Sequence, residues 1–235
     1  MKLLEKFDIY FAAPFFNGGH TALNRLLVKC IESRGRSVFL PQRDGYEFAR
    51  LKVALAAILS TDEIAETIEI IILFFDLGYR LPRGQVVVAC LDEPIDSGVS
   101  DEVAQADIMN IPVIGFRTDV RSPYGSLADP LGGAHFFPAC RCRVFIRHPM
   151  PTGSDEELVS LAENILAEFH ALTSGFPALR AYPPKVSELI YYANLLFEGI
   201  PDIHSTEGID LVIKHYLEHR EKLCKLLPKV KIVNG

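Results

Sequence analysis

The strongest constraint on the fold is a repeated order of short apolar runs and amphipathic helical stretches over the first 120 residues. A helix is predicted over 21–35, where apolar side chains recur at helical spacing and Gly35 follows the last of them. Four short β-favouring runs accompany it, at 8–15, 37–44, 85–92 and 111–119. Alternation of strands and helices in this order predicts an α/β fold built on a parallel sheet.

The run QVVVACLD at 85–92 is the clearest strand, because it is short, continuous and rich in valine. A loop follows it, then a predicted helix over 101–110 and the strand at 111–119. These further strand, helix, strand steps favour an open, doubly wound sheet of the flavodoxin or Rossmann type. Residues 47–75 are apolar and predicted to be mainly helical.

The composition changes after Pro151, where helical patterns replace the alternation. An amphipathic helix is predicted over 154–175, with Ser154 as its cap and Glu157 three residues later. Two more helical stretches follow, at 186–199 and 210–227. The sequence therefore predicts an α/β domain over 1–150 and a C-terminal helical extension over 151–235.

Charge and cysteine content exclude several classes of partner. The net charge is −6 and no basic run is long enough to neutralise a phosphate backbone, so no nucleic acid polymer is expected as a partner. No stretch approaches the roughly 18 apolar residues of a membrane helix. The N-terminal run carries Asp8 and lacks a cleavage site after it. Five scattered cysteines fit reduced thiols, so a cytoplasmic protein that does not engage a membrane is expected.

A metal site near Cys140 and Cys142 is conceivable, because His135 and His148 are close to them in the sequence. Their spacing matches no standard zinc pattern. Ordinary buried or strand cysteines explain the pattern better, and no metal is expected.

Polar side chains gather where the predicted strands end. In an open parallel sheet, the ligand crevice lies beyond the carboxyl ends of the strands. Tyr10 is within the first strand, and the other candidates follow strands: Gln42, Asp92, Asp96, Gly98, Glu102 and Arg117. We expect these residues to converge on one crevice. Arg117 would either contact a ligand there or form a salt bridge with Asp119 at the strand end.

Glu102 is the leading candidate for chemistry, because it is predicted to lie at a helix start that favours an ionised carboxylate. Such a carboxylate can attack an anomeric carbon, while a second acid or base such as Asp76 serves the leaving group. The alternative, on spacing alone, is that Glu102 is an ordinary glutamate at a helix start.

Together these residues resemble the nucleoside 2-deoxyribosyltransferase family. The supporting segments are IYFAAPFF at 9–16, VFLPQRDG at 38–45, VVVACLDEPIDSGVSDEVAQA at 86–106 and IPVIGFRTDVR at 111–121. The most specific element is an aspartate, a glycine two residues later and a glutamate six residues after the aspartate, here Asp96, Gly98 and Glu102. Asp76 stands twenty residues before Asp96, as in the family.

The resemblance implies a role for each of these residues. Glu102 would be the nucleophile, Asp76 would contact and protonate the base, Asp96 would help hold the sugar, and Tyr10 would orient the nucleophile. It also implies that no cofactor is needed, that the small-molecule substrates are a deoxynucleoside and a free nucleobase, and that the chain forms a homo-oligomer. Val99, Ser100, Val103 and Ala104 depart from the family pattern and would alter substrate or acceptor preference.

The leading functional hypothesis is therefore a transferase that exchanges the nucleobase of 2′-deoxynucleosides by double displacement through a covalent deoxyribosyl-Glu102 intermediate. One alternative is an N-glycoside hydrolase of (deoxy)nucleosides or nucleoside monophosphates, in which Arg117 would meet a phosphate. Another is a non-catalytic nucleotide-sensing module.

Overall fold

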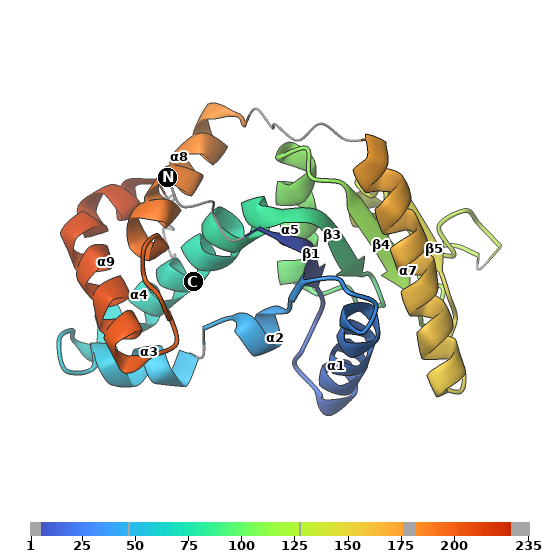
Figure 1. Cartoon of the computed structure of the whole chain (residues 1–235), viewed down its shortest axis with the longest axis horizontal. Coiled ribbons are helices and arrows are strands. Elements are labelled where there is room, and N and C mark those ends of the chain that lie inside the picture. The colour runs from blue at the N-terminus through green and yellow to red at the C-terminus, as the bar shows by residue number, and fades with distance from the viewer. Residues whose placement is uncertain (1–5, 47, 127, 176–181, 227–235) are drawn as a thin grey trace, which may run out of the picture. The chain divides into compact units, whose positions relative to one another are not determined.

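The computed structural model describes residues 6–46, 48–126, 128–175 and 182–226 (Figure 1). The chain forms two compact units, each assembled from two separate segments. The α/β unit comprises Met1–Gly45 and Arg80–Pro183, and the helical unit comprises Tyr46–Tyr79 and Pro184–Gly235.

The α/β unit is built on a five-stranded parallel sheet in the order β2-β1-β3-β4-β5. Its strands are β1 (Phe7–Ala12), β2 (Val38–Phe39), β3 (Gly84–Cys90), β4 (Val113–Arg117) and β5 (Val144–Arg147). β3 is the central strand and pairs with β1, with Tyr10 opposite Val87. The α/β class and the parallel sheet predicted from the sequence are confirmed.

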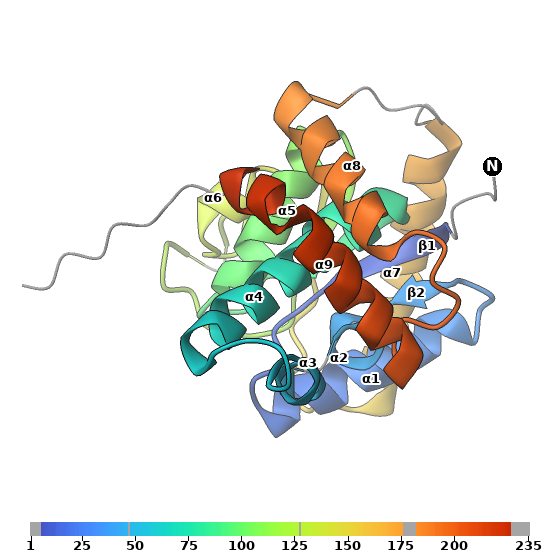
Figure 2. The same cartoon turned by 90° about the vertical axis from the view of Figure 1, so that its left-hand side faces the viewer.

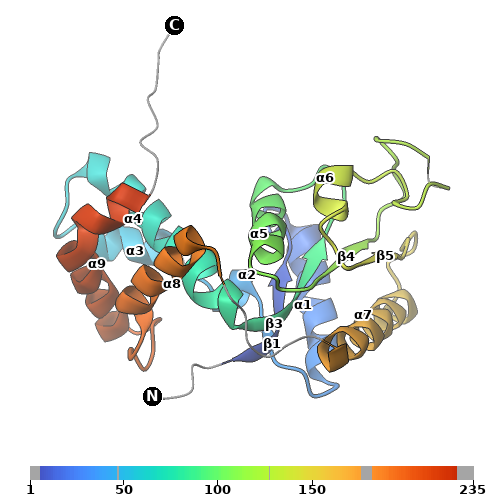
Figure 3. The same ribbon diagram turned by 90° about the horizontal axis from the view of Figure 1, so that it is seen from above.

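Helices cover both faces of this sheet (Figure 3). α1 (Gly18–Glu32) and α7 (Asp155–Gly175) pack on one face, and α5 (Ser97–Ile108) packs on the other. Residues of one strand point alternately to the two faces, so Ile9 and Phe11 face α1 and α7 while Tyr10 faces α5. The alternation in β1 therefore assigns Tyr10 to the side of the sheet where Glu102 lies.

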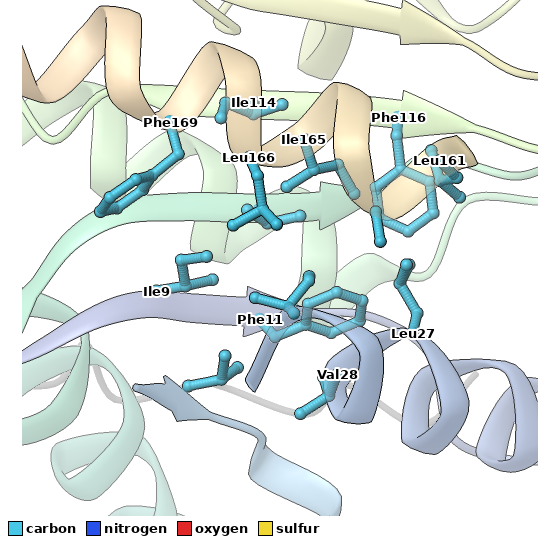
Figure 4. Packing of buried hydrophobic residues seen from close by; sticks show 14 of the residues in the cluster. Ile9, Phe11, Leu27, Val28, Ile114, Phe116, Leu161, Ile165, Leu166 and Phe169 are labelled. Carbon is cyan, nitrogen blue, oxygen red and sulfur yellow. The ribbon is translucent and has the colours of Figure 1, made fainter. Parts of the chain in front are cut away.

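The main core lies between the sheet and the α1/α7 layer (Figure 4). Phe11 of β1 and Phe116 of β4 are fully buried and their ring centroids are 5.9 Å apart. α7 contributes Leu161 and Ile165, which are also fully buried. Each such side chain contributes about 1.5–3 kcal/mol on burial, so this layer holds the strand ends that carry the candidate site in place.

Shorter elements connect the strands. α2 (Pro41–Asp44) begins where β2 ends, because Pro41 lacks the N–H that a strand ladder needs and suits the first turn of a helix. A 3-10 turn (Leu81–Arg83) leads into β3, and α6 (Phe136–Ala139) precedes β5. The long connection between β4 and β5 therefore contains one helical turn.

The helical unit contains α3 (Phe48–Leu55), α4 (Thr61–Leu73), α8 (Pro184–Phe197) and α9 (Thr206–Leu226), all of them visible in Figure 2. α4 continues into a π-helical segment, Phe74–Arg80. Glu63 of α4 and Arg220 of α9 form an ion pair at 2.9 Å. Phe75 and Phe197 pack edge to face with their centroids 5.1 Å apart, so the π-helical segment packs against the end of α8.

The units differ from the predicted division at residue 150. α7 belongs to the α/β unit, because its apolar stripe completes the core of the sheet. The segment 46–79 belongs with the C-terminal helices α8 and α9. An amphipathic helix has the same pattern whether it packs on a sheet or on other helices, so its partner could not be read from the sequence.

Two predicted helix signals are confirmed. Ser154 and Glu157 form the reciprocal bonds of a capping box, at 3.2 and 3.3 Å, at the start of α7. Gly35 follows α1 with φ +81°, a left-handed conformation that suits glycine. Among the described residues, no helix is both long enough and apolar enough to cross a membrane.

Gly115 in the middle of β4 gives a test of this packing. A methyl group on its Cα would lie 2.6 Å from Sγ of Cys142 and 3.0 Å from Cδ1 of Leu91. We expect Gly115→Ala to lower the free energy of unfolding by about 1–3 kcal/mol, measured by urea denaturation. Gly18→Ala is the matched control, because a Cβ at that position would have no neighbour within 4 Å. Equal stability of the two variants would contradict the packing described.

Candidate active site

Tyr10 and Glu102 meet through a short hydrogen bond. The Tyr10 hydroxyl donates to Oε1 of Glu102 at 2.5 Å, and the two residues are 92 positions apart in the sequence. Tyr10 is fully buried in β1, whereas Glu102 is half-buried on α5. A hydrogen bond of this length to a carboxylate is a strong one and holds the carboxylate in one orientation. The structure thus brings together two residues that the sequence analysis expected at one crevice.

The Tyr10 ring is itself held by aromatic neighbours. Its centroid lies 5.4 Å from that of Phe39 in β2, and Phe39 stacks at 5.6 Å on Phe7. The guanidinium of Arg80 lies over the ring of Phe39, 5.1 Å from its centroid. Because these rings constrain one another, the hydroxyl that reaches Glu102 has little freedom to move.

α5 begins at Ser97, four residues earlier than the predicted helix start. Asp96 is its N-cap, and Oδ1 of Asp96 accepts a hydrogen bond from the Val99 N–H at 3.0 Å. Glu102 is therefore the sixth helical residue and lies beyond the four free N–H groups at the helix start. The prediction that the helix terminus favours an ionised Glu102 is wrong, because that effect fades after the first turn.

Asp96 and Gly98 lie at the helix start, as expected for residues near the crevice. Within the described part of the chain, Oδ2 of Asp96 accepts no hydrogen bond, so one carboxylate oxygen remains for a ligand. Gly98 is exposed, and a Cβ there would lie 3.0 Å from Oδ1 of Asp96. The small residue therefore leaves room for the capping carboxylate.

Asp92 joins the ends of two strands. Its Oδ1 accepts hydrogen bonds from the N–H groups of Thr118 and Asp119, at 2.6 and 3.0 Å. Its Oδ2 accepts from the hydroxyl of Thr118 at 2.6 Å. Both oxygens of this predicted substrate-binding residue are thus occupied in tying the end of β3 to the end of β4.

Arg117 is 3% exposed and serves the loop that follows it. Nη1 donates to the carbonyl of Gly132 at 2.7 Å, and Nη2 donates to Oδ1 of Asp119 at 2.7 Å and to the carbonyl of Arg121. The alternative raised from the sequence, a salt-bridged strand end, describes this residue. Nη1 and Nη2 thus hold the strand end and the loop after it, and contact of Arg117 with a ligand or a phosphate stays a prediction.

Gln42 also has partners within the α/β unit. Its Oε1 accepts from Nδ2 of Asn24 at 3.0 Å, and its Nε2 donates to the carbonyl of Thr21 at 3.2 Å. Both partners belong to α1, so the predicted substrate-binding amide connects α2 to α1.

Asp76 lies in the helical unit, within the π-helical segment Phe74–Arg80. Turns of π-helix inside α-helices are frequent at functional sites. The role of Asp76 beside Glu102 stays a prediction.

Two acidic residues hold the strand ends: Glu93, which was not among the candidates from the sequence, and Asp119, which was expected there. Glu93 is 6% exposed, and its carboxylate accepts from the N–H groups of Ile95 and His135 at 3.2 and 3.0 Å. Oδ2 of Asp119 accepts from the N–H of Glu93 at 2.7 Å. The only sequence signal for Glu93 was an acidic residue within three positions of the end of β3, which does not distinguish a structural acceptor from a ligand contact.

The cysteine and histidine residues near position 140 are dispersed. Cys140 is exposed, whereas burial raises the pKa of Cys142 to about 12, so that its thiol stays protonated at neutral pH. A ring nitrogen of His148 lies 2.9 Å from the carbonyl oxygen of Glu157. Within the described ranges, no three histidine, cysteine, aspartate or glutamate side chains are grouped as metal ligands.

Comparison with known proteins gave no relative: no protein-family model matches the chain, and a search of the curated proteins found no match.

Proposed function

We propose that the chain exchanges the nucleobase of 2′-deoxynucleosides, with Glu102 as a covalent nucleophile. The observation that carries this proposal is the 2.5 Å hydrogen bond from the Tyr10 hydroxyl to Oε1 of Glu102. A nucleophilic carboxylate must keep one rotamer and present one oxygen to the anomeric carbon. Tyr10 holds the Glu102 carboxylate in one orientation, and we assign the attack on the anomeric carbon to this carboxylate.

The reaction consists of two displacements at C1′ of the sugar. In the first, a carboxylate oxygen of Glu102 forms a bond to C1′ while the bond from C1′ to the base nitrogen breaks, and the base leaves with that electron pair and a proton. In the second, a nitrogen of another base forms a bond to C1′, the ester bond to Glu102 breaks and the carboxylate is restored. The incoming base gives up the proton that the departing base required.

Supporting roles are assigned to two aspartates. Asp76 supplies the proton to the departing base and takes one from the incoming base, as the resemblance implies. Asp96 contributes Oδ2 to a sugar hydroxyl, because its Oδ1 is the cap of α5. Three other candidates position the elements around the site without contacting the substrate: Asp92, Gln42 and Arg117.

The finer fold assignment is part of the proposal. We infer a doubly wound sheet of the flavodoxin-like class, supported by the strand order β2-β1-β3-β4-β5 and by helices on both faces. In such a sheet the strand order reverses between β1 and β3, and the crevice outside their carboxyl ends binds the ligand. Tyr10 of β1 and the start of α5 after β3 border this point.

The test is chromatography of the purified chain incubated with deoxyinosine or thymidine, with and without adenine. The proposal expects a new deoxyadenosine peak that requires both the donor and adenine. Free base released at the same rate without adenine would assign the chain to hydrolysis. No change in either mixture, at protein concentrations sufficient for single-turnover detection, would overturn a reaction at the N-glycosidic bond of nucleosides.

The Tyr10 hydrogen bond gives a graded prediction. We expect Tyr10→Phe to lower kcat for exchange by about 10- to 100-fold, since a hydrogen bond to a charged group is worth about 1.5–3 kcal/mol. KM should change little, because the ring remains. Tyr216→Phe is the control: it removes another buried tyrosine hydroxyl, one that bonds Thr67 in the helical unit. Equal rates in both variants would contradict the role of Tyr10.

A further inference from the structure

A hollow of about 410 Å³ lies in the α/β unit against α5. Ser100 and Ala104 of α5 line it, two residues before and two after Glu102. At 3.6 residues per turn these positions lie about 160° around the helix from Glu102. The hollow therefore faces away from the Tyr10–Glu102 pair, and its volume is within the range of small-molecule sites.

Exposed aromatic rings form one side of the hollow. Tyr124 and Phe137 are 57% and 66% exposed, although solvent exposure of large apolar rings is unfavourable. His135 lies between them, with ring centroids 4.6 Å from Tyr124 and 5.2 Å from Phe137. Both pairs are close to perpendicular, at 73° and 67°. Rings at right angles offer one face and one edge to a planar guest.

Buried polar residues hold these walls in place. Glu93 uses one carboxylate oxygen for the N–H of Ile95 and the other for the N–H of His135, so a single side chain fixes two walls of the hollow. The N–H of Tyr124 donates to the carbonyl of Gly133 at 3.2 Å. The proposed exchange reaction does not use Glu93. A buried carboxylate that fixes two walls is what a preformed binding site requires.

Charges around the hollow are balanced. Arg141 pairs with Asp107 at 3.0 Å, and Glu93 is satisfied by backbone N–H groups. An ionic guest would therefore meet no uncompensated partner. The Ser100 hydroxyl and the remaining N–H groups of Arg141 offer hydrogen bonds to an uncharged polar guest.

We propose that this hollow binds an uncharged, planar heteroaromatic ring of purine size, either free or carried on a sugar. The ring stacks on Phe137 or Tyr124, and its polar edge bonds Ser100 and Arg141. The inference goes beyond the proposed exchange reaction and does not depend on it, because Glu102 does not line the hollow.

The test is isothermal titration of the full chain with adenosine, adenine and adenosine monophosphate. We expect adenosine and adenine to bind, and Phe137→Ala to weaken binding by about tenfold, as loss of one stacking ring does. Ala104→Phe fills the hollow and should weaken binding at least as much. Tyr191→Ala is the control, because Tyr191 on α8 is 58% exposed, as Tyr124 is. Thermal melting of each variant establishes that it is folded.

Each outcome of the titration has a distinct meaning. Adenosine binding that is equal in all variants, or no detectable binding at millimolar concentration, would overturn the site. Tighter binding of adenosine monophosphate than of adenosine would overturn the uncharged ligand class. Failure of base exchange would leave the titration result unaffected, so the two proposals are tested separately.

Discussion

Glu102→Gln is expected to lower kcat for base exchange by at least about 10³-fold, because an amide cannot form the glycosyl ester. The substitution keeps the shape of the side chain and leaves an oxygen that can still accept from Tyr10. Chromatographic formation of deoxyadenosine from deoxyinosine and adenine measures the loss. Mass spectrometry of the denatured parent protein, quenched during turnover, should reveal an added deoxyribosyl group.

The matched control is Asp101→Asn, which changes the adjacent, exposed carboxylate of α5 in the same way. It should retain the parent rate. Substantial exchange by Glu102→Gln, or an equal loss in Asp101→Asn, would show that Glu102 is not the nucleophile. The labelled peptide should contain Glu102, and a label on another residue would lead to the same conclusion.

Arg117→Met is expected to lower the free energy of unfolding by about 3–5 kcal/mol, the effect of removing one partner of a buried ion pair. The guanidinium is 3% exposed and bonds Asp119 and the carbonyl of Gly132. Methionine fills part of the space but removes the guanidinium from Asp119, which keeps the N–H groups of Arg121 and Glu93, and from the Gly132 carbonyl. Urea denaturation followed by circular dichroism measures the change.

Arg34→Met provides the comparison, because Arg34 pairs with Glu163 on the surface, where the two side chains are 34% and 62% exposed. A surface ion pair of this kind is worth about 0–1 kcal/mol. If Arg117→Met were no more destabilising than Arg34→Met, the loop after β4 would not depend on Arg117. Because Tyr124 and His135 of that loop line the hollow, Arg117→Met would in that case bind adenosine as the parent does.

The residues that the structure brings together share one physical feature in the sequence. Tyr10 lies in an apolar run whose alternation assigns its side chain to one face, and Glu102 follows the strand that pairs with that run. Parallel pairing makes such positions neighbours. The meeting of two residues 92 positions apart was therefore predictable, although the 2.5 Å contact was not.

Other candidates were correctly located at strand ends but have different partners. Asp92, Gln42 and Arg117 all bond to their own unit. A carboxylate, amide or guanidinium has the same identity in the sequence whether it meets a ligand or a backbone N–H. The positions of the neighbouring backbone groups decide whether such a side chain binds a ligand or the backbone. Those positions are set by tertiary packing.

The sequence by itself determined the parallel α/β class, the strand positions, the cap of α7 and the glycine after α1, because these depend on local periodicity and backbone preference. The tertiary structure alone decided that α7 packs on the sheet, that 46–79 joins the C-terminal helices, and that Glu93 holds both walls of a hollow. Those outcomes depend on which apolar faces and which polar groups meet across long sequence separations, and that is set by burial of the whole chain.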